Sequence, residues 1–184
     1  SRLYTGPMYT KYNTTLRAAK GDSATLVQRR DELCGSNRYV TTISVINSAI
    51  LKLGKLLPAQ KVYRGVSGCA LPEQFRVPNA QNIRGGVEMS FMSTTTNRQV
   101  ALSYAARGSG LVMEIQLGMV DRGADVSWLS QYPQEKEILF APLTGLEVTS
   151  LRTEGSIILA EMRLSVNFTS PPIEQAVAKL KYSH

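Results

Sequence analysis

Two glutamates separated by a single residue stand immediately before an apolar run, in the sequence YPQEKEILF of residues 132–140. The apolar residues 138–140 predict a buried β-strand, and strand alternation would place Glu135 and Glu137 on one face, about 6–7 Å apart. Carboxylates at that distance repel each other and raise each other's pKa, which favours a cation between or beyond them. The alternative is a pair of solvated charges at the start of a strand, and the pair alone leaves both interpretations open.

Two further strands carry polar side chains at positions where a buried strand has no need of them. Arg64 lies inside the apolar segment 62–66, where an arginine is costly to bury unless paired, so it either faces outward or binds an anion. The segment 91–96, FMSTTT, ends in hydroxyl-bearing side chains, which either serve a site or are β-forming residues before a helix cap. Each signal is weak when taken alone.

The positions of histidine and cysteine limit the chemistry. The only histidine is His184, the last residue, and a chain terminus rarely holds a catalytic group, which excludes Ser–His and Cys–His nucleophiles and histidine-based zinc sites. Cys34 and Cys69 lack the spacing of metal ligands and form either one disulfide or two free thiols. We therefore expect chemistry based on carboxylates, hydroxyls, arginine, lysine and tyrosine, without a metal.

Length and composition indicate a single globular domain spanning residues 1–184. Hydrophobic residues make up 43% of the chain, and no apolar run approaches the ~20 residues of a transmembrane helix. The net charge of +7 favours anionic partners, but the cations are scattered and no aromatic-rich platform accompanies them, so we do not expect nucleic acid as a partner. The chain does not begin with methionine, which suggests a processed protein or an excised domain.

The elements that would position these residues change in kind at about residue 61. Before it, apolar spacing predicts helices at 8–20, from a cap at Asp22 or Ser23 to about 34, and at 41–56. After it, short apolar runs predict strands at 62–66, 87–93, 111–117, 137–141, 147–151 and 157–166. Helices are also expected at 98–106, capped by Asn97, and from Pro171 onward. Helices first and strands later predict an α+β fold.

Taken in order, the strand arginine, the Ser-Thr-Thr strand end and the Glu-x-Glu pair resemble the arginine–serine–glutamate branch of mono-ADP-ribosyltransferases. That family includes vertebrate ecto-enzymes and the enzymatic parts of binary actin-modifying toxins, and the resemblance covers about residues 12–151. Arg64-Gly65 matches the first motif, and Phe91 to Thr95 matches aromatic-x-Ser-Thr-Ser, with Thr95 replacing the last serine. The resemblance implies N-terminal helices followed by a mostly antiparallel core of two β-sheets.

The resemblance also implies that NAD⁺ is the substrate, and it assigns roles to the motif residues. Glu137 would bind the ribose 2′-hydroxyl and face an oxocarbenium-like transition state, and Ser93 would orient Glu137. Arg64 would bind the pyrophosphate through its planar fork, and the backbone of Gly65 would hold the nicotinamide amide. Further residues expected at the NAD⁺ site are Thr94, Thr95, Tyr104, Arg107, Tyr12 and Arg17.

Tyr104 matches the aromatic residue that stacks on nicotinamide, and Arg107 matches a second phosphate-binding cation. From the residues alone, the alternatives are a tyrosine that faces the core and a solvated charge at a helix end.

On the acceptor side, the first glutamate of the third motif accompanies arginine as the target in the family. Glu135 would orient the guanidinium and assist its deprotonation, and Tyr132 would belong to the loop that recognises the acceptor. The implied partner is a protein with an exposed arginine, and the resemblance favours a secreted or extracellular location. Two other functions stay open: hydrolysis of NAD⁺ at the same site, and non-catalytic binding of NAD or nucleic acid.

Overall fold

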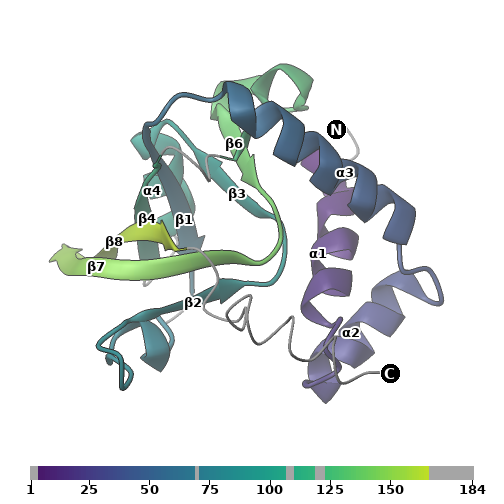
Figure 1. Cartoon of the computed structure of the whole chain (residues 1–184), viewed down its shortest axis with the longest axis horizontal. Helices are drawn as coiled ribbons and strands as arrows, with labels where there is room; N and C mark the ends of the chain where they lie inside the picture. Colours follow the sequence, from purple (N-terminus) through teal and green to yellow (C-terminus); the bar gives the residue numbers. More distant parts are fainter. Residues whose placement is uncertain (1–3, 69–70, 107–109, 119–122, 166–184) are drawn as a thin grey trace, which may run out of the picture.

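The N-terminal part of the protein forms a layer of helices on one side of the strands (Figure 1). The computed structural model describes residues 4–68, 71–106, 110–118 and 123–165. A short turn η1 (Tyr4–Met8) leads into the helices α1 (Tyr9–Arg17), α2 (Ala24–Cys34) and α3 (Val40–Leu53). The hydroxyl of Ser23 accepts a hydrogen bond from the Leu26 amide, so the cap predicted for the second helix is confirmed.

The strands form one continuous sheet in the order β2-β7-β8-β4-β1-β3-β6-β5. They are β1 (Lys61–Ser67), β2 (Gly85–Glu88), β3 (Met92–Thr95), β4 (Gly110–Gln116), β5 (Ala124–Asp125), β6 (Glu137–Phe140), β7 (Thr144–Glu154) and β8 (Ile157–Ser165). Neighbouring strands pair antiparallel except β4 and β8, which run parallel. The α+β class with a mostly antiparallel sheet is therefore confirmed.

The expected division of the core into two sheets is not confirmed, because the described strands belong to one sheet. The part β2-β7-β8-β4-β1 meets the part β3-β6-β5 through the pairing of Tyr63 with Thr95. Both parts nevertheless contribute to one hydrophobic core, in which Val62 and Met162 of the first part pack with Ile138 of the second. Strand patterns in a sequence show which face is buried but not which edges pair, so they do not distinguish a curved sheet from two packed sheets.

The apolar segment 87–93, expected as one strand, is divided between two. The chain bends at Ser90, whose amide and hydroxyl both donate to Oε1 of Glu88, at 3.0 and 2.7 Å. Because β2 pairs with β7 whereas β3 pairs with β6, this bend carries the chain from one part of the sheet to the other. It thereby brings Ser93 to the strand next to β1.

Helix α4 (Arg98–Ala105) packs directly on β1. It begins at Asn97, whose side chain accepts a hydrogen bond of 3.0 Å from the Gln99 amide, so this predicted cap is also confirmed. A Cβ built at Gly65 would lie 1.9 Å from the Ala101 carbonyl oxygen, so only glycine permits this approach of helix and strand. The contact fixes α4, and with it Tyr104, against the strand that carries Arg64.

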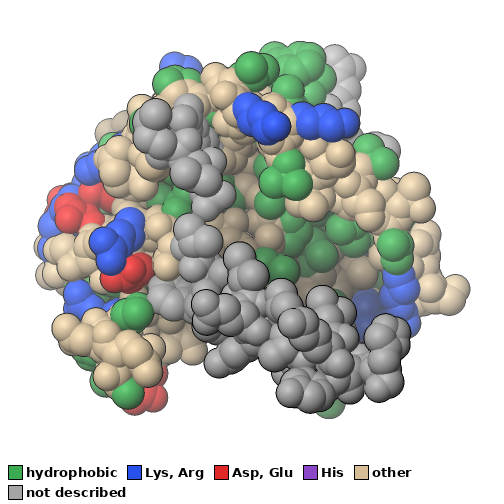
Figure 2. Space-filling model, viewed as in Figure 1, with side chains coloured by type: hydrophobic (Ala, Val, Ile, Leu, Met, Phe, Trp, Pro, Cys, Tyr) green, Lys and Arg blue, Asp and Glu red, His purple; other side chains and the backbone are tan. Residues whose placement is uncertain are grey.

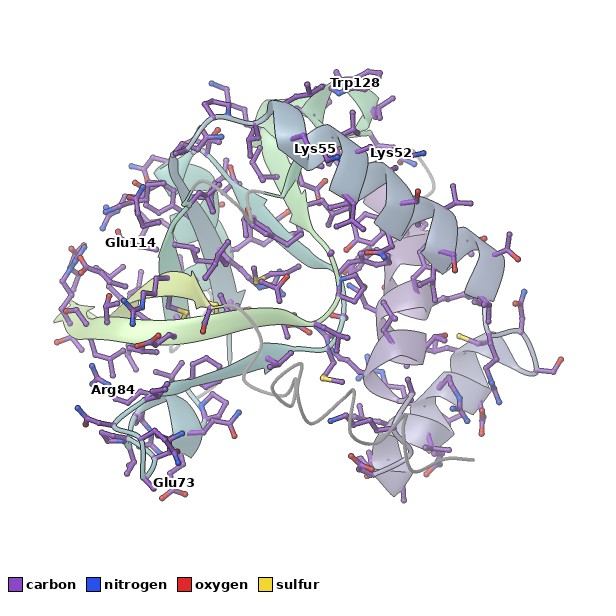
Figure 3. The ribbon with its side chains drawn as sticks, viewed as in Figure 1. Lys52, Lys55, Glu73, Arg84, Glu114 and Trp128 are labelled. Atoms are coloured by element: carbon purple, nitrogen blue, oxygen red, sulfur yellow. The ribbon has the colours of Figure 1, made fainter. Side chains whose placement is uncertain are left out.

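A charged network links α4 to β4 and β7 through Glu114, which is labelled in Figure 3. The carboxylate of Glu114, only 4% exposed, accepts hydrogen bonds from Arg98 Nε at 3.2 Å and from Arg152 Nη2 at 3.0 Å. Elsewhere on the face shown in Figure 2, lysine and arginine side chains are scattered and do not form a single stripe.

Several predictions concern residues beyond those described. Arg107, Cys69 and the helix expected from Pro171 onward all lie outside the described residues. Cys34 is described, and it is buried with a free thiol that lies 3.7 Å from the Thr15 hydroxyl. Among the described helices, none combines the length and the apolar character needed to cross a membrane.

Candidate active site

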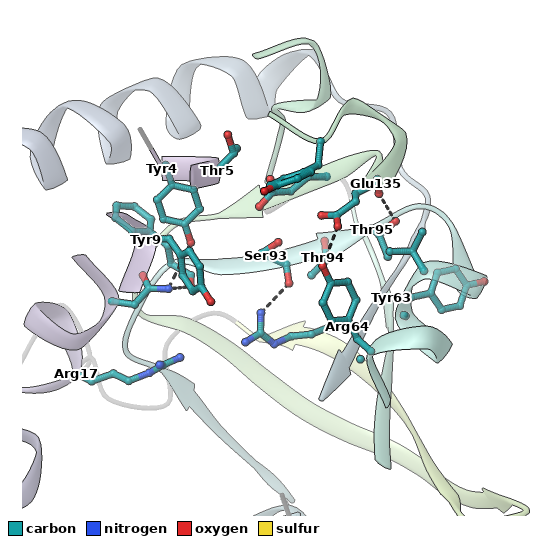
Figure 4. A pocket seen from close by; sticks show the side chains of 18 residues that line it. Tyr4, Thr5, Tyr9, Arg17, Tyr63, Arg64, Ser93, Thr94, Thr95 and Glu135 are labelled. Atoms are coloured by element: carbon teal, nitrogen blue, oxygen red, sulfur yellow. Dashed lines mark hydrogen bonds between the residues drawn. The ribbon is translucent and has the colours of Figure 1, made fainter. Parts of the chain in front are cut away.

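A cavity of about 370 Å³ lies between α1 and the junction of β1, β3 and β6 (Figure 4). Its lining includes Arg64, Ser93 and Glu137, which the sequence predicts as the three motif residues, together with Glu135. Residues far apart in the sequence are therefore brought together by the pairing of neighbouring strands.

Arg64 reaches the cavity because of its position in β1. Val62 and Arg64 are two residues apart on the strand and share a face, and Val62 is fully buried in the core while Arg64 is partly buried at the cavity. Nη1 of Arg64 donates a hydrogen bond of 2.7 Å to the carbonyl oxygen of Ser93. Burial lowers the pKa of Arg64, and the nearby Glu88 opposes this shift. Since a guanidinium keeps its proton at any physiological pH, the cavity wall carries a fixed positive charge.

Glu137 is the first residue of β6, paired with Thr95, and it is only 7% exposed. Burial raises the pKa of its carboxyl, and the charge of Glu135 raises it further. The hydrogen bond from the Ser93 side chain and the charge of Arg64 act in the opposite direction. The structure thus brings Ser93 and Glu137 into the contact that the sequence predicts, with the carboxyl shielded from water.

Glu135 lines the same cavity from a turn that precedes β6, and not from the strand itself. It ends the 3₁₀ turn η5 (Pro133–Glu135), and Lys136 then adopts a left-handed conformation with φ of 48° before β6 begins. Strand alternation is therefore not the reason that the two glutamates lie together, because the chain turns between them. Both carboxylates still line the cavity.

The hydroxyls of Thr94 and Thr95 hold this turn in place. The Thr95 hydroxyl donates a hydrogen bond of 2.5 Å to the Glu135 carbonyl oxygen, and the Thr94 hydroxyl donates one of 2.8 Å to the Ile138 carbonyl oxygen. Both threonines line the cavity as predicted, but their hydroxyls donate to the main chain of residues 135 and 138, on either side of Glu137. Their contribution is therefore to fix the two glutamates relative to β3.

Two tyrosines that precede Glu135 in the sequence share its cavity. Tyr104, which is 51% exposed, donates a hydrogen bond of 2.8 Å from its hydroxyl to Oε1 of Glu135. This bond is the main cause that raises the pKa of Tyr104 to about 12. Tyr132 is about half exposed and also lines the cavity, so both predicted aromatic residues are at the site.

Helix α1 contributes a row of polar side chains, but not the one predicted at Tyr12. Tyr9, Asn13 and Arg17 are spaced by four residues and line the cavity. Tyr12 is only 2% exposed and packs in the core, with its ring edge-on to that of Tyr39. Asn13 and Tyr9 stand four and eight residues before Arg17, and neither is among the site residues predicted from the sequence.

Asn13 and Arg17 add polar groups to the lining of the cavity. Nδ2 of Asn13 donates at 3.4 Å to both the Tyr4 hydroxyl and the Phe91 carbonyl, whereas its Oδ1 is buried without a hydrogen-bond partner among the described residues. Arg17 pairs with Glu88 at 3.3 Å and extends toward the side of the cavity where Arg64 lies (Figure 4).

This arrangement fits a ligand such as NAD⁺. Two guanidiniums suit a pyrophosphate, and an unsatisfied buried acceptor suits a ribose hydroxyl or an adenine amine. A shielded carboxylate suits a developing positive charge. Within the described part of the chain, no group of three or more histidine, cysteine, aspartate or glutamate side chains converges as a metal site would require.

Comparison with known proteins agrees with this geometry. The model of the ADP-ribosyltransferase exoenzyme family matches residues 2–163. The chain belongs to this family. The resemblance inferred from Arg64, Ser93 and the two glutamates is thereby confirmed at the level of the family.

Individual relatives support the same assignment. A protein of Mycobacterium avium (strain 104), Mav, which is named as an NAD(+)--arginine ADP-ribosyltransferase, is 31% identical over 137 residues. The match covers 74% of this chain but only 14% of the relative's length.

Two solved structures share the fold. The ADP-ribosyltransferase HopU1 of Pseudomonas syringae has a TM-score of 0.65 and 22% identity, with coverage of 86% of this chain and 66% of that one. The ADP-ribosyltransferase Vis, crystallised in complex with agmatine, has a TM-score of 0.62 and 19% identity, with coverage of 93% and 74%. Vis is a toxin from Vibrio splendidus.

Proposed function

We propose that this chain transfers ADP-ribose from NAD⁺ to the arginine side chain of a protein acceptor and releases nicotinamide. The observation that carries the proposal is the presence of both Glu135 and Glu137 in the cavity that also contains Arg64 and Ser93. The name of the Mav relative and the agmatine bound to Vis support arginine as the acceptor, because agmatine carries the same guanidinium group.

On the NAD⁺ side, Arg64 and Arg17 would bind the pyrophosphate and hold the nicotinamide ribose near Glu137. The bond between nicotinamide and ribose C1′ breaks with its electron pair leaving on nicotinamide, and positive charge develops on the ribose. The carboxylate of Glu137 accepts a hydrogen bond from the 2′-hydroxyl and stabilises that charge. Because the carboxylate is buried, its interaction with the charge is screened less than it would be in water.

On the acceptor side, an arginine enters next to Glu135. A guanidinium is a poor nucleophile while protonated, so a carboxylate that binds it and takes up a proton favours attack of its nitrogen on C1′. Tyr132, half exposed on the same wall, would contact the acceptor residue. Water in place of arginine would give hydrolysis of NAD⁺ at the same site.

The test is an assay with labelled NAD⁺, agmatine and the purified chain, with Glu137→Gln as the inactive control. We expect ADP-ribosyl-agmatine and nicotinamide to form together, in amounts that rise with agmatine. Nicotinamide release without any adduct would assign the chain to NAD⁺ hydrolysis. Tight NAD⁺ binding without turnover would assign it to non-catalytic binding.

A further inference from the structure

We propose that the Tyr104 hydroxyl positions the carboxylate of Glu135 and thereby sets the ratio of transfer to arginine over hydrolysis of NAD⁺. This inference rests on the proposed function and extends it to a residue whose ring, and not its hydroxyl, is implied by the family resemblance. The observation is the hydrogen bond of 2.8 Å from the Tyr104 hydroxyl to Oε1 of Glu135.

The packing of α4 on β1 fixes the position of the Tyr104 Cβ atom. Helix α4 lies against β1 so closely that a Cβ at Gly65 would be 1.9 Å from the Ala101 carbonyl oxygen and 3.0 Å from Cβ of Tyr104. The base of the tyrosine therefore cannot move away from or toward the strand without displacing the helix. Its ring extends from this fixed point along the cavity wall to Glu135.

Glu135, by contrast, has a fixed backbone and a long side chain. Its carbonyl is held by Thr95, and its main chain ends a 3₁₀ turn before the left-handed Lys136. These contacts leave the torsions of the side chain unrestrained, and a glutamate in that situation samples several rotamers. The Tyr104 hydroxyl selects the rotamer that directs the carboxylate into the cavity.

The hydrogen bond leaves Glu135 able to bind an acceptor. A carboxylate offers about four acceptor positions over two oxygens, and Tyr104 occupies one position on Oε1. An incoming guanidinium would bind at the remaining positions, in a geometry that the tyrosine has already set. The hydroxyl therefore lowers the cost of ordering Glu135 when the acceptor arrives, which is the effect of preorganisation.

The role of the hydroxyl should be confined to the acceptor side. Glu137 is oriented by Ser93 and by its place at the start of β6, and neither contact involves Tyr104. The site of nicotinamide release therefore keeps its geometry when the tyrosine hydroxyl is absent. Loss of the hydroxyl should impair transfer and spare hydrolysis.

The test is Tyr104→Phe, which keeps the ring and removes only the hydroxyl. We expect the kcat/KM for agmatine to fall about tenfold, the size expected for a lost hydrogen bond to a charged group. Hydrolysis of NAD⁺ and the KM for NAD⁺ should stay within about twofold of wild type. Hydrolysis retained in the same preparation shows that the variant is folded.

The matched control is Tyr39→Phe, which deletes a hydroxyl from a described tyrosine that is not among the residues lining the cavity. It should leave both activities unchanged. Unaltered agmatine kinetics in Tyr104→Phe would overturn the proposal, and so would an equal decline of transfer and hydrolysis, which would place the hydroxyl on the NAD⁺ side. Absence of transfer in the wild-type chain, measured first, would overturn the proposed function instead.

Discussion

Nη1 of Arg64 donates a hydrogen bond of 2.7 Å to the carbonyl oxygen of Ser93, so the first two motifs of the site are joined directly. Arginine carries five N–H donors, and this bond uses one of them. The contact fixes the plane of the guanidinium, and the other donors can then meet a ligand in a defined orientation. Arg64 is in this way part of the sheet junction and also part of the cavity proposed to bind NAD⁺.

Arg64→Lys tests that double role. Lysine keeps the charge but loses the planar fork, so it cannot both donate to Ser93 and bind a phosphate with two parallel bonds. We expect the KM for NAD⁺ to rise about tenfold, with the melting temperature little changed. Steady-state kinetics and thermal melting measure both. An unchanged KM would show that Arg64 serves the sheet junction alone.

Glu137→Gln should reduce both transfer and hydrolysis by about 10²–10³-fold, because an amide does not supply the negative charge that the transition state requires.

The Glu137→Gln variant should nevertheless be at least as stable as wild type at neutral pH. Burial raises the pKa of Glu137 in the folded protein, so the folded state binds a proton more tightly than the unfolded state. The stabilisation that comes from this tighter proton binding by Glu137 is therefore fully present below the ordinary pKa of a glutamate. It is lost as the pH rises through the pKa of Glu137 in the folded protein.

Thermal melting of Glu137→Gln and wild type at pH 4 and pH 7 checks the second half of that prediction. We expect the variant's advantage, if measured as a difference in melting temperature, to be larger at pH 7. A variant that is active, or one that is destabilised only at pH 7, would contradict the assignment of Glu137 as a buried, ionised carboxylate.

Gly65→Ala should destabilise the protein, because the new Cβ would lie 1.9 Å from the backbone oxygen of Ala101. A clash with backbone cannot be relieved by a side-chain rotation, and overpacking of this kind costs about 1–3 kcal/mol of the free energy of unfolding. Chemical denaturation measures this value. Gly118→Ala is the matched control, since nothing lies within 4 Å of a Cβ at Gly118. Equal stability of the two variants would refute the close packing of α4 on β1.

Arg17→Ala should weaken NAD⁺ binding, because Arg17 lies on the cavity-lining row of α1. Loss of a charged contact to phosphate predicts a rise in the Kd for NAD⁺ of about tenfold. Lys20→Ala removes an exposed cation just beyond the same helix and should leave the Kd unchanged. Calorimetric titration compares the two, and equal effects would show that Arg17 acts only through the net charge.

The sequence predicts the motif residues better than the path of the chain between them. Arg64, Ser93 and Glu137 stand in strands, and strand pairing then brings them together without further information. Tyr12 was misplaced because helical spacing does not show which face meets a cavity and which meets a core. The sequence does not predict the turn at Lys136, because no pattern of residues indicates that this lysine adopts a left-handed backbone conformation.

The two glutamates should be separable by mutation, since they are held by different parts of the structure. Glu135→Gln leaves the contacts of Glu137 with Ser93 and the position of Arg64 intact, but it replaces the carboxylate that would orient and deprotonate an incoming guanidinium with a neutral amide. Transfer to agmatine should therefore collapse by at least tenfold, while hydrolysis of NAD⁺ continues at a comparable rate.

One preparation of Glu135→Gln, assayed for nicotinamide released without acceptor and for ADP-ribosyl-agmatine formed with it, measures both outcomes. A parallel fall in the two activities would place Glu135 in the NAD⁺ machinery and remove the support for arginine specificity. Retention of both activities would show that Glu135 is only a solvated charge just before β6. Loss of transfer alone is the result expected if Glu137 serves the donor and Glu135, held by Tyr104, serves the acceptor.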